Sequence, residues 1–175
     1  SKGKSEILPR LFRMIKDSGG CRPAVVSRFE EYYVGDGDEW YGEHPVLTPD
    51  ECAGLEFFSC VFSTYPSSEE ADKAVAVIKK ELGEYVNPQR NGVHVDIPPA
   101  NTDKGTSVLK AAELFGVEKG SIYAIGDNMN DASMVTRFKG YAMESGSPDL
   151  AALSLGTVKS VSEIIDIILK ENNLL

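Results

Sequence analysis

A cluster of carboxylates and carboxamides follows one short segment of the sequence. The residues from Ser121 to Ile125 form a largely apolar run, typical of a strand buried on both faces of a parallel sheet, and Gly126 ends it. Asp127 then stands at the strand end, and Asp131 lies about one helical turn further, so both side chains can face one small volume. Ligands bind at the carboxyl ends of parallel strands, and paired carboxylates attract a hard divalent cation. The spacing predicts a Mg²⁺ site with Asp127 and Asp131 as ligands.

A second polar segment, Asn101 to Gly105, opens the helix expected before this strand. Lys104 would stand at the start of that helix, where the helix dipole disfavours a positive charge, so a purely structural role is less natural. Near the carboxylates, it would offer positive charge to an anionic substrate. The residue types alone leave two other interpretations open. Asp127 and Asn128 are also ordinary helix caps, and an isolated lysine is ordinarily a solvated surface charge.

These segments need a parallel sheet to position them, and the sequence after Pro98-Pro99 has the pattern for one. The range 104–115 is predicted to be a helix with an apolar face made by Val108, Ala111, Ala112 and Phe115. Helices and strands are predicted to alternate beyond it, over 121–125, 131–138, 140–143, 148–153 and 162–170. We therefore place a domain boundary at the prolines, between residues 1–98 and residues 99–175.

The first part of the chain has a different pattern, which predicts an antiparallel sheet with two helices. An amphipathic helix is expected over 6–16 and a second up to about residue 82, where Ser67 and Glu70 have the spacing of a capping box. Asn91-Gly92 is typical of a hairpin turn. A strand is predicted over 23–34, and a second short strand shortly after the turn at residues 35–38. Further strands are predicted over 55–65, 85–86 and 93–97.

The two chemical segments together resemble a known family. Asp103-Lys104-Gly105, followed by Gly126-Asp127-Asn128-x-Asn130-Asp131, is similar to the third and fourth motifs of haloacid dehalogenase (HAD) phosphatases of the Cof-like type. The resemblance covers residues 97–175 well and the preceding part only as a pattern. It implies an α/β fold in which residues 99–175 form the C-terminal part of a Rossmann-like HAD core, a parallel sheet with flanking helices. Residues 1–98 would form an α+β cap domain with an antiparallel sheet.

The resemblance also implies roles for the matching residues. A nucleophilic aspartate on the first core strand would attack phosphorus, and water would hydrolyse the aspartyl phosphate. Lys104 would bind and neutralise the phosphoryl oxygens, and Asn130 would contact the phosphoryl region. Asp127 would bind Mg²⁺ directly, and Asp131 would hold a metal-bound water or orient Lys104. A positioned lysine and a metal ion supply the charge stabilisation that phosphoryl transfer needs.

The family's first motif, Asp-x-Asp-Gly-Thr after an apolar strand, has no match in the sequence. Asp36-Gly37-Asp38 has the Asp-x-Asp spacing, but Glu39-Trp40 follows it, and such Asp-Gly repeats are turn formers. Ser27 faintly suggests the second motif, but it precedes Asp36 and so breaks the family's order. We therefore expect the nucleophile to lie in a missing N-terminal segment. Either that segment or another chain would complete the sheet beside the strand that ends at Asp127.

Charge and composition limit the partners. The chain carries 18 basic and 27 acidic residues, a net charge of −9 that disfavours nucleic acid and anionic membranes. Its three cysteines form no C-x-x-C pair, and the simplest setting is the reducing cytoplasm.

The expected partner is a small phosphorylated metabolite such as a sugar phosphate. The functional hypothesis is a Mg²⁺-dependent phosphatase in the full-length form. The 175-residue chain alone is expected to be inactive. A phosphomutase, and a non-catalytic fragment or binding domain of the HAD fold, are the alternatives. His94, and Trp40, Tyr41 and His44, are expected to be surface or edge-packing residues.

Overall fold

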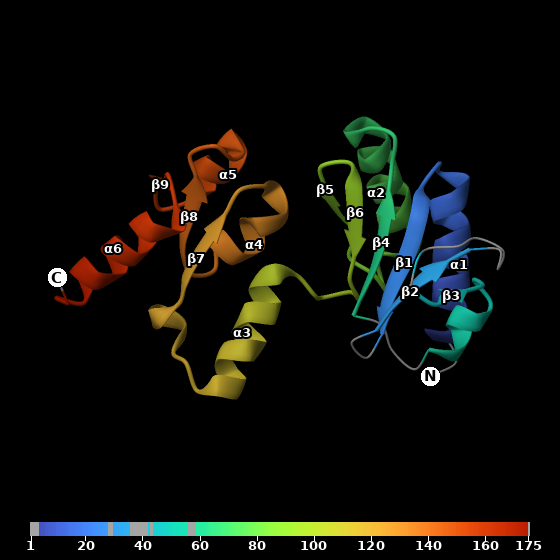
Figure 1. The fold of residues 1–175 in the computed structure, drawn as a ribbon, viewed down its shortest axis with the longest axis horizontal. Helices are drawn as coiled ribbons and strands as arrows, with labels where there is room; N and C mark the ends of the chain where they lie inside the picture. Colours follow the sequence, from blue (N-terminus) through green and yellow to red (C-terminus); the bar gives the residue numbers. More distant parts are fainter. Residues whose placement is uncertain (1–3, 28–29, 36–41, 43, 56–58, 175) are drawn as a thin grey trace. The chain divides into compact units, whose positions relative to one another are not determined.

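A computed structural model describes residues 4–27, 30–35, 42, 44–55 and 59–174 of the chain. The chain divides into two units, and the division falls between Thr102 and Asp103. Unit 1 runs up to Thr102 and unit 2 begins at Asp103. The boundary expected after Pro98 lies slightly earlier, in the segment that joins the last strand of unit 1 to the first helix of unit 2 (Figure 1).

The elements of unit 1 follow the predicted mixture of strands and helices. They are α1 (Lys4–Asp17), β1 (Cys21–Ser27), β2 (Glu30–Val34), β3 (Val46–Leu47), η1 (Glu51–Gly54), β4 (Cys60–Thr64), α2 (Ser68–Leu82), β5 (Gln89–Asn91) and β6 (His94–Ile97).

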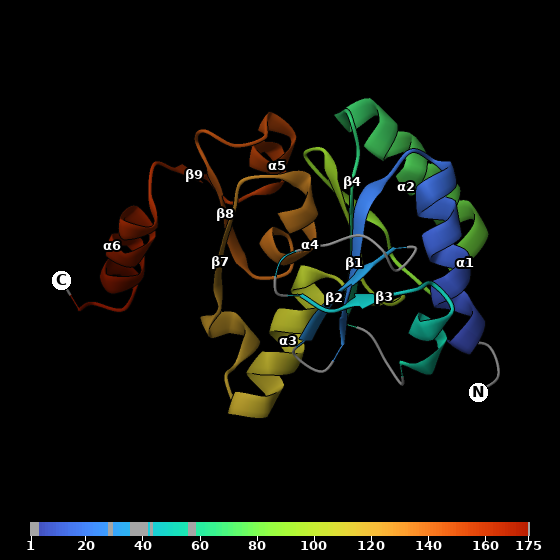
Figure 2. The same ribbon diagram turned by 45° about the vertical axis from the view of Figure 1, so that its right-hand side comes forward.

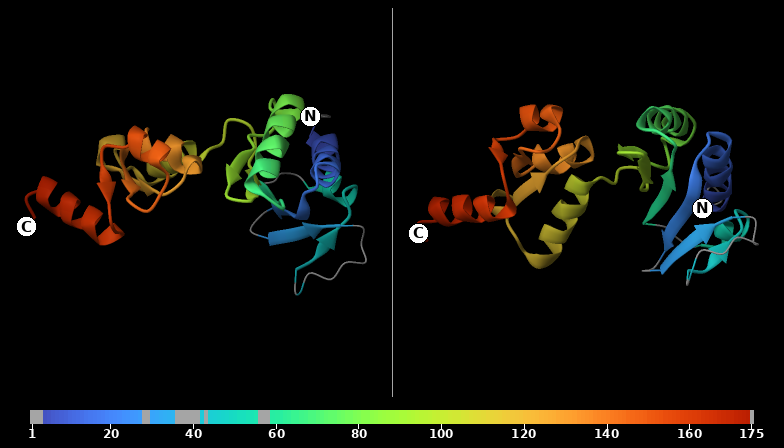
Figure 3. Two further views of the ribbon diagram at one scale, coloured as in Figure 1. Left: turned by 90° about the horizontal axis from the view of Figure 1, so that it is seen from above. Right: turned by 45° about the horizontal axis from the view of Figure 1, so that its top comes forward.

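Unit 1 is organised around one sheet. Among the described residues its strand order is β3-β2-β1-β4-β6-β5, and the neighbours are antiparallel except for β2 and β3. The helices α1 and α2 lie side by side over one face of this sheet (Figures 2 and 3). Their apolar faces form a common core with the sheet, in which Leu11 and Ile15 of α1 meet Ile78 of α2 and Val61 of β4.

Local sequence signals located several of these elements correctly. Ser67 is the N-cap of α2, and its side chain accepts a hydrogen bond from the Glu70 amide, as predicted. The hairpin at Asn91-Gly92 is also present, and Gly92 has the positive φ of 63° that this turn requires. Its first strand is β5, however, and not residues 85–86. Val86 makes only an isolated bridge to Pro99.

The single strand predicted over 23–34 is wrong. Two strands, β1 and β2, occupy this range and pair in antiparallel fashion, with Ser27 opposite Glu30. Only Arg28 and Phe29 separate the paired ends. The pattern missed the reversal because neither residue is one of the Gly, Asn, Asp or Pro residues that usually mark a tight turn.

Unit 2 has the predicted alternation of helices and strands. Its elements are α3 (Lys104–Phe115), η2 (Lys119–Ser121), β7 (Tyr123–Gly126), η3 (Met129–Asp131), α4 (Ala132–Val135), β8 (Lys139–Met143), α5 (Pro148–Leu153), β9 (Thr157–Val158) and α6 (Val161–Glu171). In the described part of this unit the strands form a parallel sheet in the order β7-β8-β9. A small core of Val135, Ala142 and Leu150 joins α4 and α5 to β8.

Unit 2 leaves one strand edge and several apolar side chains uncovered by the described residues. The strand β7 pairs with β8, and within the described residues no strand pairs with its other edge. Ala112 of α3 is buried, but Phe115, predicted to share its apolar face, is 82% exposed. Leu114 and Ile165 are also exposed. Phe115 therefore departs from the predicted pattern because no described element packs on the end of α3.

Among the helices that the structure describes, none combines the length and the apolar character that crossing a bilayer requires.

The core of unit 1 generates a direct test of stability. Ile78 and Val77 are neighbours on α2, but Ile78 is 1% exposed and Val77 is 50% exposed. Ile78→Ala should lower the free energy of unfolding by about 2–5 kcal/mol, because it removes buried methyl groups and leaves a cavity. Val77→Ala should change it by less than about 0.5 kcal/mol. Urea denaturation followed by circular dichroism measures both, and equal losses would contradict this packing of α2.

Candidate active site

The carboxylate cluster lies at the carboxyl end of β7, where the chain turns into η3. Asp127 follows Gly126, the last residue of the strand, and Asp131 ends η3. Asn128 is the N-cap of η3, and its side chain accepts a hydrogen bond from the Met129 amide at 2.8 Å. The capping interpretation therefore holds for Asn128, while Asp127 lies outside the cap and is exposed at the strand end.

The side chain of Asp131 folds back over the strand end. Its Oδ2 accepts a hydrogen bond from the Asp127 amide at 3.0 Å, and its carboxylate is 7% exposed. A Cβ atom on Gly126 would lie 2.4 Å from the Asp131 Cβ, closer than real Cβ contacts come. Glycine at position 126 therefore makes room for the buried carboxylate.

Lys104 reaches this carboxylate from another element. It is the first residue of α3, and its ammonium donates a hydrogen bond to Asp131 Oδ1. The lysine side chain remains 48% exposed. A buried carboxylate is costly unless it is paired and hydrogen-bonded, and Lys104 and the Asp127 amide together satisfy Asp131. The structure thus brings Lys104 and Asp131 together, with the cation still open to solvent on one side.

The start of α3 is held by its own cap. The Asp103 carboxylate accepts a hydrogen bond from the Thr106 amide at 2.6 Å, and the Thr106 hydroxyl closes the capping box by accepting one from the Asp103 amide. Partial burial acts to raise the pKa of Asp103. The hydrogen bonds from Thr106, the charge of Arg137 and the Ser133 hydroxyl outweigh it and hold that pKa below its usual value. Asp103 therefore stays ionised and keeps the first turn in place.

Two polar groups beside this pair have no partner in the described residues. One is the carboxylate of Asp127, for which the described residues provide no hydrogen bond or ion pair. The other is Oδ1 of Asn130, a residue that is 8% exposed. In the described ranges, no three His, Cys, Asp or Glu residues gather closely enough to hold a metal ion by themselves. Such a small donor set suits Mg²⁺, which takes one or two carboxylates and keeps waters or substrate oxygens.

The loop after β8 supports Asp127 and was not singled out from the sequence. The Ser147 amide donates a hydrogen bond to the Asp127 carbonyl at 2.8 Å, so the ends of the two adjacent strands are joined. Glu144 to Ser147 is a polar segment with a glycine, which is a turn signal. That signal gives the position of a loop but does not reveal its contact with Asp127.

The remaining candidate residues lie in unit 1 or outside the described residues. His94 is exposed on β6, with Nδ1 3.0 Å from Thr64 Oγ1, and the His44 ring meets the Tyr33 ring edge-on at 5.4 Å. Ser27 is buried in β1. Asp36, Asp38, Trp40 and Tyr41 lie outside the described residues.

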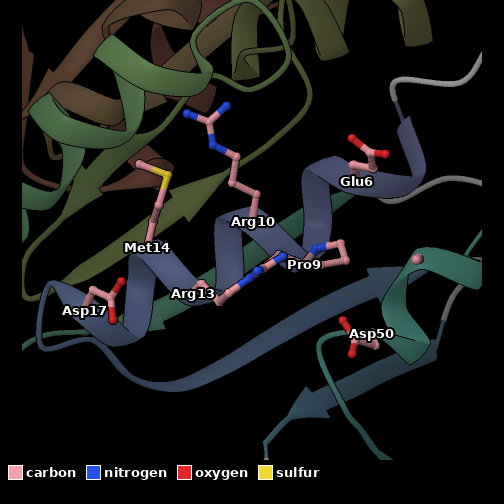
Figure 4. Close-up of a pocket in the computed structure, with 8 residues that line it drawn as sticks. Glu6, Pro9, Arg10, Arg13, Met14, Asp17 and Asp50 are labelled. Atoms are coloured by element: carbon pink, nitrogen blue, oxygen red, sulfur yellow. The ribbon is translucent and has the colours of Figure 1, made fainter.

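Unit 1 also contains a groove of about 710 Å³ along α1 and η1 (Figure 4). It is lined by two arginines, Arg10 and Arg13, and three acids, Glu6, Asp17 and Asp50. Arg10 is already paired with Glu81 at 2.9 Å. This mixed lining presents no concentrated charge of one sign, and it does not select a phosphorylated ligand.

The chain resembles several known proteins. It is 40% identical over 76 residues to the 5-amino-6-(5-phospho-D-ribitylamino)uracil phosphatase YwtE of Bacillus subtilis, an alignment that covers 42% of this chain and 26% of YwtE. The structure of a HAD/Cof-like hydrolase from Plasmodium vivax matches with a TM-score of 0.75 at 11% identity, over 98% of this chain and 65% of that chain. A HAD subclass IIB sugar phosphatase matches with a TM-score of 0.72 at 15% identity, over 98% of this chain and 67% of the other.

The chain thus spans between 26% and 67% of the length of these relatives. The structural matches confirm the predicted fold class, with a parallel sheet of the HAD core and an antiparallel sheet. Residues 30–168 match the family model of the haloacid dehalogenase-like hydrolases, and the chain belongs to this family.

Proposed function

We propose that the protein is a Mg²⁺-dependent phosphoric monoester hydrolase that acts on a small phosphorylated metabolite such as a sugar phosphate. The observation that carries this proposal is the half-exposed side chain of Lys104, whose ammonium is held on the buried carboxylate of Asp131, near Asp127, a carboxylate without a partner among the described residues. A fixed cation next to a carboxylate free to bind a metal is the arrangement that phosphoryl transfer requires, because charge must be stabilised on the phosphoryl oxygens.

The contacts suggest a division of roles between the two carboxylates. Asp127 is the better metal ligand, because its carboxylate is exposed and has no partner among the described residues. Asn130, whose buried Oδ1 lacks a partner among them, would contact the phosphoryl region. Asp131 already uses Oδ1 for Lys104 and Oδ2 for the Asp127 amide. We therefore favour its orienting role over direct metal contact. When bound here, Mg²⁺ would supply positive charge that lets a phosphate dianion approach the carboxylates.

The attacking carboxylate must then come from elsewhere. Asp131 is engaged by hydrogen bonds, Asp127 is assigned to the metal, and the described residues gather no third acidic group with them. The edge of β7 with which no described strand pairs offers a place for a further strand. We propose that such a strand, from a segment outside these 175 residues or from another chain, carries the nucleophile.

The reaction would then proceed in two displacements. The nucleophilic carboxylate oxygen forms a bond to phosphorus while the bond from phosphorus to the ester oxygen breaks, and the leaving alkoxide takes up a proton. Water next attacks the phosphorus of the aspartyl phosphate, which releases inorganic phosphate and restores the carboxylate. Lys104 would contact the phosphoryl oxygens in both steps, and Asp131 would keep its ammonium in place.

The substrate class and the compartment are supported by separate observations. YwtE is named as a phosphatase of a phosphorylated ribityl compound, which favours a phosphate ester of a sugar or sugar alcohol here. All three cysteines are free, and burial raises the pKa of Cys52 and of Cys60 to about 12, so these two thiols stay protonated. Free cysteines agree with a reducing cytoplasm.

The metal assignment predicts the behaviour of Asp127→Asn in the whole protein. This variant keeps the shape of the side chain but loses its charge, so Mg²⁺-dependent hydrolysis of p-nitrophenyl phosphate should fall by roughly 10²–10³-fold. EDTA should abolish the activity of the unmodified protein, and added Mg²⁺ should restore it. Asp166→Asn, which removes an exposed carboxylate of α6, is the matched control and should leave the rate unchanged. Undiminished activity in Asp127→Asn would overturn the assignment.

The missing nucleophile predicts a different result for the 175-residue chain alone. Isothermal titration calorimetry should detect Mg²⁺ binding that Asp127→Asn abolishes in this chain. Hydrolysis of p-nitrophenyl phosphate by the unmodified 175-residue chain should be no faster than by its Asp127→Asn variant. The site can hold a metal, but it contains no carboxylate free to attack. Mg²⁺-dependent turnover by the purified chain would refute the proposal that the nucleophile is supplied from outside it.

A further inference from the structure

The first turn of α3 approaches α4 at backbone-to-backbone distance. A Cβ atom on Gly105 would lie 2.3 Å from the Ser133 carbonyl oxygen and 3.2 Å from the Met134 amide nitrogen. Only glycine fits such an approach without moving one of the two helices. The residue that follows Lys104 is therefore in direct contact with the backbone of a helix that begins immediately after Asp131.

The side chain of Ser133 ties these two helix starts together. Its Oγ accepts a hydrogen bond from the Gly105 amide at 3.1 Å. The first amides of a helix have no partner within the helix, so they need an acceptor from outside. Asp103 serves Thr106, and Ser133 serves Gly105.

A second contact also joins the start of α3 to the α4 segment. Arg137, just beyond α4, places Nη2 3.9 Å from Asp103 Oδ2. Both side chains are partly buried. The first turn of α3 is thus connected to two residues of the α4 segment, because Ser133 bonds to Gly105 and the charge of Arg137 lies near Asp103. Ser133 is the closer of the two, and it bonds directly to the residue that follows Lys104.

We infer that Ser133 is a positioning residue for Lys104. By fixing the start of α3 against α4, the Ser133 hydroxyl sets the distance that the Lys104 side chain must span to reach Asp131. This inference rests on the proposed role of Lys104 in phosphate binding. Lysine has a long stem with many rotamers, so its ammonium is placed reproducibly only if both backbones are fixed. Ser133 fixes them from a position two residues after Asp131, and it needs no contact with the substrate.

Ser133→Ala removes the bridge without adding bulk, and it can be tested in two ways. In the 175-residue chain, hydrogen exchange of the Gly105 amide, followed by NMR, should accelerate by roughly tenfold, as expected when one hydrogen bond is lost. In the whole protein, kcat for p-nitrophenyl phosphate should fall by about 10- to 100-fold, because a misplaced catalytic group costs this much. KM should change by less than about twofold, since the phosphate still meets the same charges.

Two further variants separate positioning from a loss of stability. Ser107→Ala is the matched control, because the Ser107 hydroxyl bonds to the Asp103 carbonyl at the same helix start but does not reach α4. It should leave kcat and the exchange of Gly105 unchanged. Ser133→Thr keeps a hydroxyl and should restore most of the activity. Thermal unfolding of each variant checks that the fold is retained.

The outcomes distinguish this inference from the proposed function. Unchanged exchange at Gly105 in Ser133→Ala would overturn the bridge, and equal losses of kcat in Ser133→Ala and Ser107→Ala would overturn the positioning role. If the whole unmodified protein hydrolyses no phosphate ester, the proposed function fails and so does the catalytic half of the inference. Accelerated exchange at Gly105 would then still support the bridge between α3 and α4.

Discussion

The contact between the Lys104 ammonium and the buried Asp131 carboxylate is the interaction on which the site of unit 2 depends. Removing one partner of a buried ion pair leaves an uncompensated charge, which is far more costly than the pair itself. Asp131 therefore needs Lys104, and Lys104 is held where a substrate can still reach it. The beginning of α3, the end of β7 and the start of α4 must all keep their places for this contact to form.

The surrounding backbone meets this requirement through close approach. Gly126 gives the Asp131 side chain space to fold over the strand end, and Gly105 lets α3 lie against the backbone of α4. The loop after β8 holds the Asp127 carbonyl through Ser147. Each device fixes a backbone position and leaves the side-chain charges unchanged. Unit 2 thereby concentrates its polar groups at one end of a small parallel sheet.

Features set by neighbours in the sequence could be predicted, and features set by tertiary contacts could not. Ser67 and the Asn91-Gly92 turn were found because caps and tight turns use specific residue types. The cluster from Asp127 to Asp131 was found because it directly follows a buried strand. The reversal between β1 and β2 was missed because their pairing specifies it and no turn residue in the sequence marks it.

The same distinction applies to the site. The pattern identified Lys104, Asp127, Asn130 and Asp131 as candidates, but it left two roles open for Asp131. The hydrogen bonds that engage Asp131 come from the Lys104 ammonium and the Asp127 amide, and a backbone amide carries no signature in the sequence. Ser133 was likewise not singled out, because a serine in a short helix has no distinctive pattern, and only the approach of α3 gives it a partner.

The division of the chain between Thr102 and Asp103 has an evolutionary consequence. Every residue to which we assign a chemical role follows that point, and Asp103 itself caps the helix that carries Lys104. Substitutions in unit 1 can therefore accumulate without changing any of these residues. We expect related sequences to vary more before this point than after it.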